Sequence, residues 1–407
     1  MLNANQEREL AYGVTIDEIV PIEGADRVEV AKVGGWRVMV RKGQFVAGDP
    51  AIYFEIDSKV PETETFEFLA QKHYKVKTQK YFKGTVISQG LLMSADDFGW
   101  TVEKPLITPA YIVDDEGKPH IPGDQHSMFL TKKLGVTYYE AEDNKRKAPS
   151  ADKYTKMARR MGKKFSKFPY RNLMKHTWGK KLLYLFYGKK LDKKNGWPEW
   201  VKKTDEERAQ NIPWILEDKN PWIATEKIDG TSTTFTMKRG KRGKNDVYVC
   251  SRNVVFDTPD KACYYDKNVY FESFEKYNIK QVLTELLEEN PKAEWVTIQG
   301  ETYGNTVQKR DYSLKDRDFM AFNLIFSNKG RVGTVEMTEI LTKKGVPCVP
   351  ILDTEFILPD TVDELLDMAT GDSKIDGKPR EGIVFRSPDG TRSFKAVSNS
   401  FLLKYHG

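Results

Sequence analysis

The stretch "WIATEKIDGTSTTF" at residues 222–235 places Lys227 and Asp229 one residue apart, with Gly230 directly after them. In an extended chain, alternate side chains point to the same side, so Lys227 and Asp229 would face one site together. Asp-Gly is also an ordinary hairpin signal, and a strand that ends in a turn would explain the stretch without any chemistry. The rest of the chain decides between these two interpretations.

The size and composition of the chain narrow the class of protein. Its 407 residues exceed what one hydrophobic core usually serves, so we expect two or three domains. No apolar run reaches the length of a membrane span, and "MLNANQEREL" lacks the apolar core of a signal peptide. Cys250, Cys263 and Cys348 are too few and too scattered for a disulfide framework or a zinc site. We therefore expect a cytoplasmic protein, a monomer, with no membrane partner.

The basic residues are concentrated in one central segment. Residues 144–203 contain 20 Lys and Arg against 3 acidic residues, although the whole chain has a net charge of only +6. Aromatic residues alternate with the basic ones in "KKFSKFPYRNLMKHTWGKKLLYLFYGKK" at 163–190. Lysines that neutralise phosphates and rings that stack on bases are typical of nucleic-acid contact, and a solvated basic linker is the equally open alternative. The candidate nucleic-acid contacts are Lys163, Lys164, Lys180 and Lys181.

Three segments follow from the pattern along the chain. Residues 1–143 contain five or so short alternating strands between Gly turns, which predicts an OB-like β-barrel that binds nucleic acid, with a turn-rich extension. Residues 144–203 form the basic connector. Residues 204–407 predict an α+β domain with antiparallel sheets.

The expected elements of the last segment are strands and three helices. Thr204 and Glu207 form a capping-box signature that predicts a helix start, and helical spacing of apolar residues predicts one helix over 273–290. A third helix is expected near 335–345. The strands are expected in the stretches at 222–230, 231–240, 247–253, 295–304, 318–326, 381–390 and 392–405.

Six short motifs follow one another in the C-terminal segment. They are "EKIDG" (Glu226, Lys227, Asp229), "SRN" (Arg252), "GETYG" (Glu301), "DFMAFNL" (Phe319, Phe322), "EGIVFR" (Glu381) and "SFKAVSNSF" (Lys395). In this order they resemble the motifs of covalent nucleotidyltransferases, the superfamily of ATP-dependent ligases and mRNA capping enzymes. The resemblance spans residues 204–407 and implies a nucleotidyltransferase domain in which Lys227 is the nucleophile.

The chemistry explains why a lysine is needed. A free lysine amine has a pKa near 10.4, so deprotonating it at neutral pH costs roughly 4 kcal/mol. Burial, another ammonium or a divalent cation nearby would favour the neutral amine. Lys227 would then attack the α-phosphate of ATP, expel pyrophosphate and form a lysyl-AMP phosphoramidate. An arginine could not replace it, because guanidinium stays protonated.

The resemblance also assigns roles to the other motif residues. Asp229 and Glu381 would hold Mg²⁺ or Mn²⁺, directly or through its waters, with Glu301 as a further carboxylate of this metal set. Glu301 would also accept hydrogen bonds from the ribose hydroxyls, and Glu226 belongs to the nucleotide-binding residues. Phe322 would stack on the adenine, with Phe319 as the alternative ring.

The phosphate contacts show one departure from the family pattern. Arg252 would hold the nucleotide phosphate or the 5′-phosphate end, Arg208 is a candidate triphosphate contact, and Lys395 would lie at the α-phosphate. Related ligases often carry Lys-x-Lys in the last motif, but here the second position is Val397. Phosphate neutralisation would then depend on Lys395 alone or draw on Lys404.

The order of the domains narrows the family further. The sequence ends shortly after Lys395, without room for the C-terminal OB domain of DNA ligases and capping enzymes, and the β-rich segment comes first. This arrangement resembles the branch of nick-sealing RNA ligases with an N-terminal OB domain. We expect an ATP-dependent RNA ligase that joins 3′-OH and 5′-phosphate ends, with RNA as partner and a nicked duplex with a 3′-OH RNA strand as substrate. A capping-type guanylyltransferase and a nucleic-acid-binding protein with a decayed ligase domain are the alternatives.

Overall fold

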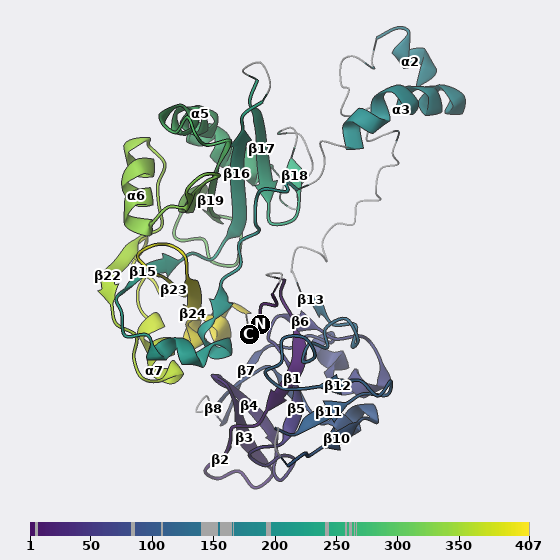
Figure 1. The fold of residues 1–407 in the computed structure, drawn as a ribbon, viewed down its shortest axis with the longest axis vertical. Coiled ribbons are helices and arrows are strands. Elements are labelled where there is room, and N and C mark those ends of the chain that lie inside the picture. Colours follow the sequence, from purple (N-terminus) through teal and green to yellow (C-terminus); the bar gives the residue numbers. More distant parts are fainter. Residues whose placement is uncertain are drawn as a thin grey trace.

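The computed structural model divides the chain into two regions and a small helical part between them (Figure 1). We call residues 1–139 the N-terminal region and residues 197–406 the C-terminal region. The structure describes residues 1–4, 7–82, 86–106, 109–139, 154, 165, 167–192, 197–240, 244–256, 259, 263, 265 and 267–406.

The N-terminal region consists of short antiparallel sheets. Strand β5 (Pro50–Phe54) lies between β1 (Ala11–Thr15) and β9 (Leu91–Met93). A second sheet contains β2 (Glu18–Pro21), β3 (Val28–Val33) and β4 (Trp36–Arg41), and β7 (Thr78–Tyr81) pairs with β8 (Val86–Gln89). The remaining pairings are β10 (Thr101–Glu103) with β11 (Tyr111–Val113), β11 with β12 (Pro119–His120), and β13 (Thr137–Tyr138) with β6 (Ser58–Lys59). A 3₁₀ helix, η1 (Glu64–Lys72), lies between β6 and β7.

The predicted barrel is not closed by backbone pairing among the described strands. β4 lies beside β8 and β9, and the Met39 N–H of β4 donates to the Ser88 side chain of β8 at 3.0 Å instead of to a backbone carbonyl. Gly90 stands between β8 and β9 with φ +98°, a backbone angle that side-chain-bearing residues rarely adopt. The chain turns there, so the two strands join different sheets.

The described residues of the C-terminal region form two sheets (Figure 1). The first has the order β14 (Glu207–Arg208), β24 (Ser393–Val397), β23 (Gly382–Arg386), β15 (Trp222–Lys227) and β22 (Ile351–Phe356). The second has the order β18 (Val255–Phe256), β17 (Asp246–Ser251), β16 (Thr231–Lys238), β19 (Trp295–Gly304), β20 (Arg317–Phe326) and β21 (Gly330–Arg331). Apart from β14 with β24, the pairings are antiparallel, so the expected α+β class with antiparallel sheets is confirmed.

Helices cover the second sheet and one face of the first. α4 (Val269–Lys276), α5 (Ile279–Glu289) and α6 (Thr334–Lys343) pack on the second sheet, where the apolar face of α5 joins the largest hydrophobic core. α7 (Val362–Ala369) packs on the first sheet, and α8 (Asn399–Phe401) and η9 (Leu402–His406) follow β24. The single helix expected over 273–290 is therefore wrong in part, because Asn278 adopts φ +47° and separates α4 from α5.

The helix expected from Thr204 is wrong. Residues 207–208 are strand β14, and two 3₁₀ turns follow, η6 (Ala209–Asn211) and η7 (Pro213–Glu217). The capping groups have other partners: Thr204 Oγ1 lies 3.2 Å from Ser232 Oγ, and Glu207 accepts from Asn211 Nδ2 at 2.7 Å. These tertiary contacts replace the local cap.

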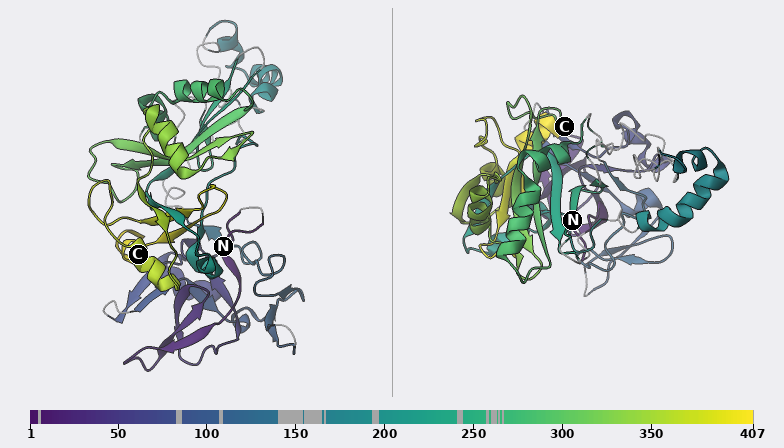
Figure 2. Two further views of the ribbon diagram at one scale, coloured as in Figure 1. Left: turned by 60° about the vertical axis from the view of Figure 1, so that its left-hand side comes forward. Right: turned by 90° about the horizontal axis from the view of Figure 1, so that it is seen from above.

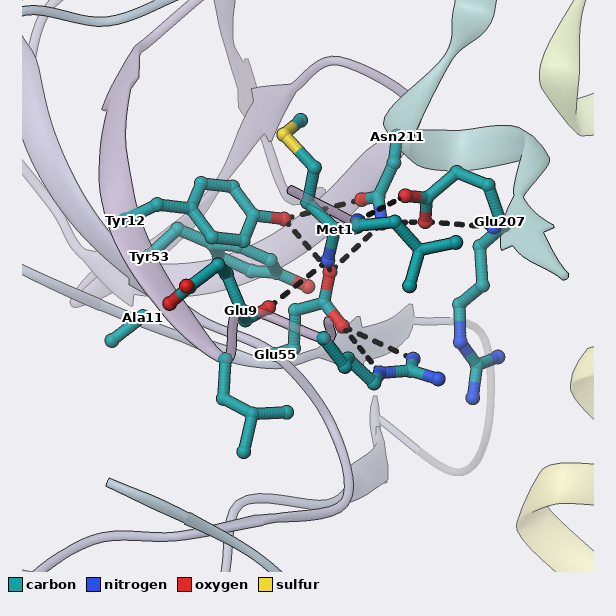
Figure 3. Close-up of polar contacts among 12 residues, drawn as sticks. Met1, Glu9, Ala11, Tyr12, Tyr53, Glu55, Glu207 and Asn211 are labelled. Atoms are coloured by element: carbon teal, nitrogen blue, oxygen red, sulfur yellow. Dashed lines mark hydrogen bonds and ion pairs between the residues drawn. The ribbon is translucent and has the colours of Figure 1, made fainter. Parts of the chain in front are cut away.

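The two regions share an interface of hydrogen bonds and apolar contacts, and Figure 3 shows its polar part. Asn211 of the C-terminal region donates to the buried Glu55 at 2.8 Å and accepts from Tyr12 at 3.1 Å. Val397 and Leu402 of the C-terminal region belong to the same hydrophobic cluster as the core of β1, β3, β4 and β5. The regions therefore share both a polar network and an apolar core.

Helices α2 (Tyr170–Leu173) and α3 (Thr177–Asp192) project away from both regions in Figure 1 and in the right-hand view of Figure 2. Leu183 of α3 packs on Phe165 and on α2. Within the described part of the chain, no helix combines the length and the apolar character needed to span a membrane.

Candidate active site

A cavity of about 770 Å³ lies where the two sheets of the C-terminal region meet the N-terminal region. Lys227, Asp229 and Gly230 line it at the point where β15 ends and β16 begins. A Cβ on Gly230 would lie 2.3 Å from the carbonyl oxygen of Thr302, so only glycine permits this approach to β19. The turn therefore brings the lysine motif beside the strand that carries Glu301.

Sheet pairing brings Glu381 to Lys227. Strand β15 pairs with β23 so that Lys227 lies opposite Gly382, directly after Glu381. The Lys227 ammonium donates to Glu381 Oε2 at 2.8 Å. Burial lowers the pKa of Lys227, but the carboxylates of Glu381, Glu301 and Asp229 outweigh burial and leave this pKa raised. These charges thus favour the ammonium form of Lys227 in the free protein.

Three acidic side chains, those of Glu381, Glu301 and Asp229, interact with this ammonium. Burial raises the pKa of Glu301 to about 8; Lys227 opposes this shift, and the negative charges of Glu381 and Asp229 add to it. Burial and the charge of Glu381 likewise hold the pKa of Asp229 well above its usual range. The Asp229 N–H donates to the buried Tyr312 hydroxyl at 2.7 Å, which fixes the turn.

These carboxylates fit a divalent cation of the magnesium type. Hard oxygen donors suit Mg²⁺ and Mn²⁺, and mutual repulsion among carboxylates is relieved by a cation between them. Among the described residues, no three His, Cys, Asp or Glu side chains are grouped closely enough to hold a metal by themselves. The donor set therefore matches a cation held by one or two carboxylates together with a phosphate, as is usual for Mg²⁺.

Basic side chains also line the cavity. Lys395 lies on β24, opposite Arg208 of β14, and both line the cavity. Burial lowers the pKa of Lys395 to about 8; Asp205 opposes this shift, whereas Arg8 and Arg208 add to it. Arg252 also lines the cavity, and its Nη2 donates to Asp205 at 2.8 Å.

Arg208 is buried, and its Nη2 donates to Asp57 of the N-terminal region at 3.2 Å. Across the described chain, its Nε and Nη1 atoms have no hydrogen-bond partner. Two unsatisfied donors of a buried guanidinium on the cavity wall are suited to bind an anion.

The two candidate rings lie in different places. Phe322 lines the cavity, with the Arg386 guanidinium 5.9 Å from its ring centroid. Phe319 is fully buried in the core beneath the second sheet, 5.2 Å from Phe235. Phe322 is thus the ring available to a nucleobase.

The remaining predicted residues are placed as follows. Glu226 lines the cavity and accepts from the Lys374 N–H at 2.8 Å. Lys404 is exposed and lies over the ring of Tyr405. Lys180 and Lys181 are on α3, away from the cavity, and Lys163 and Lys164 lie outside the described residues.

Sequence reasoning missed the contribution of the N-terminal region to the cavity. Asp205 stands in a stretch that carries part of the resemblance, but nothing there singles it out. The side chains supplied by the N-terminal region have no recognisable motif and lie far from Lys227 in sequence. The missed residues that line the cavity include Arg8, Asp57, Lys75, Lys77, Tyr138, Tyr139 and Asp205.

Comparisons with known proteins agree with this architecture. Residues 220–406 match the family model described as RNA ligase, and residues 11–95 match a model of an OB-fold domain. No curated protein matches the chain.

Solved structures match over nearly the whole length. A mutant of the Naegleria gruberi RNA ligase with ATP and Mn is 27% identical, with a TM-score of 0.70, and the match covers 98% of this chain and 100% of that one. An apo mutant of the same ligase is 25% identical, with a TM-score of 0.70 and coverage of 98% and 99%. The Naegleria ligase with PPi is 27% identical, with a TM-score of 0.68 and coverage of 97% and 98%. Residues 220–406 thus match the RNA ligase family, and the OB-fold match at residues 11–95 lies ahead of them in the chain.

Proposed function

We propose that the protein is an ATP-dependent RNA ligase that joins a 3′-hydroxyl to a 5′-phosphate through a lysyl-AMP on Lys227. The observation that carries this proposal is the Lys227 amine, which lies 2.8 Å from Glu381 in a cavity that both carboxylates and cationic side chains line. The similarity to a ligase solved with ATP and Mn and with PPi supports it.

The nucleophile must first lose its proton. In the free protein the pairing with Glu381 favours the ammonium form of Lys227. One or two of the carboxylates of Asp229, Glu301 and Glu381 would hold Mg²⁺ or Mn²⁺ together with the ATP phosphates. When bound there, the cation supplies positive charge that favours the neutral amine and offsets the charge of the phosphates.

The other cavity residues would hold the nucleotide. Phe322 would stack on the adenine, and Glu301 would accept hydrogen bonds from the ribose. Glu226 is tied by Lys374 to the same wall and would help to position the nucleoside. Lys395, Arg252 and Arg208 would bind the phosphates, because each is cationic and lines the cavity.

The proposed reaction has three steps. The Lys227 amine attacks the α-phosphorus of ATP, the bond to the β-phosphate oxygen breaks, and pyrophosphate leaves. An oxygen of the 5′-phosphate end then attacks the same phosphorus and displaces Lys227, which gives an adenylylated 5′ end. Finally the 3′-hydroxyl attacks the 5′-phosphate, loses its proton and expels AMP.

Labelling with ATP tests the first step. Incubation with [α-³²P]ATP and Mg²⁺ or Mn²⁺ should give an acid-stable label on the wild-type protein and none on Lys227→Ala. Lys329→Ala removes an exposed lysine outside the cavity and should label like the wild type. A wild-type protein without label would refute the proposal, and labelling by GTP instead of ATP would favour a guanylyltransferase.

The substrate is proposed to be a nicked duplex with RNA on the 3′-hydroxyl side, bound partly by the OB-fold domain and the basic segment 144–203. Ligation of nicked duplexes with RNA or DNA on each side of the nick tests the first part. Equal sealing of nicks with DNA on the 3′-hydroxyl side would contradict it.

The role of the basic segment is testable by salt dependence. Neutral replacement of its lysines should reduce the slope of log affinity against log salt, because fewer counterions are released. The same number of exposed lysines outside the segment, such as Lys280 and Lys343 on α5 and α6, provides the control. An unchanged slope would assign the segment another role. The lysines to replace are Lys163, Lys164, Lys180 and Lys181.

A further inference from the structure

The carboxylate of Asp205 lies at the centre of three cations in the cavity wall. Its Oδ1 accepts from Lys395 Nζ at 2.9 Å, and its Oδ2 accepts from Arg252 Nη2 at 2.8 Å. Arg8 Nη1 lies 3.5 Å from the same Oδ2. All four residues line the cavity, and only 13% of the Asp205 side chain is exposed. Three cationic groups therefore converge on one partly buried anion.

The electrostatics agree with this geometry. Burial alone would raise the pKa of Asp205, but Lys395, Arg8 and Arg252 hold this pKa far below its usual range. Arg8, Arg252 and Lys395 are three cations, and the two carboxylates that pair with them are Asp205 and Glu55, so an excess of one positive charge remains. A site with this excess attracts a second anion.

Arg8 reaches this cluster from the N-terminal region and is held there rigidly. Its Nε and Nη2 donate to Glu55 Oε2 at 3.2 and 3.1 Å, so only its third nitrogen is directed to Asp205. Glu55 is fully buried and also accepts from Tyr12 and Asn211, as Figure 3 shows. The interface between the two regions thus fixes the position of a cation in the cavity.

Tyr138 places the two guanidinium groups relative to one another. The Arg8 guanidinium lies 5.8 Å from the Tyr138 ring centroid, and that of Arg252 lies 5.5 Å from it. A ring that contacts both cations stabilises them at a fixed separation. Tyr138 belongs to β13, so the extension of the N-terminal region also takes part.

We propose that Asp205 is a positioning residue that holds Arg8, Arg252 and Lys395 around one phosphate-binding point until a phosphate replaces it. In this arrangement Arg8 is the contribution of the N-terminal region to phosphate binding at the ligase site. The inference rests on the proposed function and extends it to a residue and a region that the motifs do not include. The ligand class is a phosphate, either of ATP and pyrophosphate or of the 5′ end of the RNA.

Calorimetric binding of inorganic pyrophosphate tests the idea without any turnover. Asp205→Asn removes the competing charge at nearly constant shape, so pyrophosphate should bind about tenfold more tightly. Arg8→Lys keeps a single cation that can pair with Glu55 or reach the cluster but not both, so pyrophosphate should bind several-fold more weakly. Asp360→Asn is the matched control, because Asp360 is exposed and pairs with Lys219 on the surface.

A second arm separates the two sources of phosphate. A 5′-phosphorylated oligonucleotide and its 5′-hydroxyl counterpart are bound to the same variants. If Asp205→Asn binds pyrophosphate more tightly and Arg8→Lys binds it more weakly than the wild type, the phosphate-binding point belongs to the nucleotide. If these two changes of affinity occur only for the 5′-phosphorylated oligonucleotide, the point belongs to the RNA end. Either result supports the proposal.

The rate of lysyl-AMP formation distinguishes positioning from a purely structural role. Asp205→Asn should lower the rate at saturating ATP while it tightens apparent ATP binding, because the cations are no longer held in advance. A structural residue would lose both rate and affinity.

If a folded Asp205→Asn with a wild-type melting temperature binds both pyrophosphate and the 5′-phosphorylated oligonucleotide no more tightly than the wild type does, the proposal is overturned. Asp205→Ser is the second neutral variant if the first does not fold. If the wild type forms no lysyl-AMP, the proposed function fails. The anion affinities of Asp205→Asn and Arg8→Lys can still be measured in that case, and they test the role of Asp205 independently.

Discussion

Replacement of Asn211 by leucine should loosen the attachment of the N-terminal region. The Asn211 amide donates to Glu55 at 2.8 Å and to Glu207 at 2.7 Å. Its carbonyl oxygen accepts from Trp36 Nε1 at 2.6 Å and from Tyr12 at 3.1 Å. Leucine has a similar volume and can make none of these four bonds.

The magnitude follows from the partners of Asn211. Two hydrogen bonds to neutral groups and two to carboxylates are together worth about 5–8 kcal/mol. Burial of the leucine side chain returns roughly 2 kcal/mol. Tyr12 and Glu55 keep their own hydrogen bond at 3.1 Å. We therefore expect the net loss of stability to lie at the lower end of the resulting range, about 3–4 kcal/mol.

Urea denaturation followed by tryptophan fluorescence measures this loss, since Trp36 loses its partner at the interface. With a slope of about 2 kcal/mol per molar urea, the transition that reports the interface should shift by roughly 1.5–2 M. Asn323→Leu is the control, because Asn323 is equally buried but donates one hydrogen bond, to Gln299 at 3.1 Å, inside the C-terminal region. A shift for Asn211→Leu no larger than that for the control would refute the reasoning.

Three further substitutions test other parts of the structure. Gly35→Ala should destabilise the protein by about 1–3 kcal/mol in thermal unfolding, because overpacking costs about that much and a Cβ there would lie 2.7 Å from Gln210 Cα across the interface; an unchanged melting temperature would contradict this contact. Tyr312→Phe removes the acceptor of the Asp229 N–H and should slow lysyl-AMP formation at least several-fold, whereas wild-type rates would show that the hydroxyl does not position the turn. Burial lowers the pKa of Lys395 to about 8, so the ammonium loses its proton as the pH rises through 8, and pyrophosphate affinity should fall between pH 7 and 9. Lys395→Arg keeps its charge and should abolish this decline; an equal decline in both proteins would exclude Lys395 as its origin.

The sequence predicted the longer strands of the C-terminal region. Apolar alternation identified the stretches that form β15, β16, β17, β19 and β20, because each strand buries at least one face in a sheet. The RNA ligase family and the OB-fold domain are likewise confirmed.

The errors arose where distant contacts override local signals. The capping box at Thr204 does not start a helix, because Glu207 bonds Asn211 in the interface with the N-terminal region. The break at Asn278 depends on a left-handed backbone angle that asparagine tolerates but does not announce.

The candidate site shows the same division. Residues within the motifs, such as Lys227 and Glu381, could be identified because their spacing and order are recognisable. Arg8 could not, since its place in the cavity depends on Glu55 and on how the two regions pack. Two residues that are nearly two hundred positions apart, such as Arg8 and Asp205, show no spacing pattern in a single sequence that would predict their contact.

The shared core has a consequence for how the two regions can be separated. Val397 and Leu402 are buried among side chains of β1, β3, β4 and β5, and Gln89 donates to Asn399 at 3.0 Å. Severing the chain within 144–196 leaves this packing intact, so the halves should remain associated and should complement one another when expressed as separate polypeptides. Deletion of the N-terminal region, in contrast, would expose the apolar side chains at the end of β24, the strand that carries Lys395. A loss of activity in such a truncated protein would therefore reflect the exposed core as well as the missing domain.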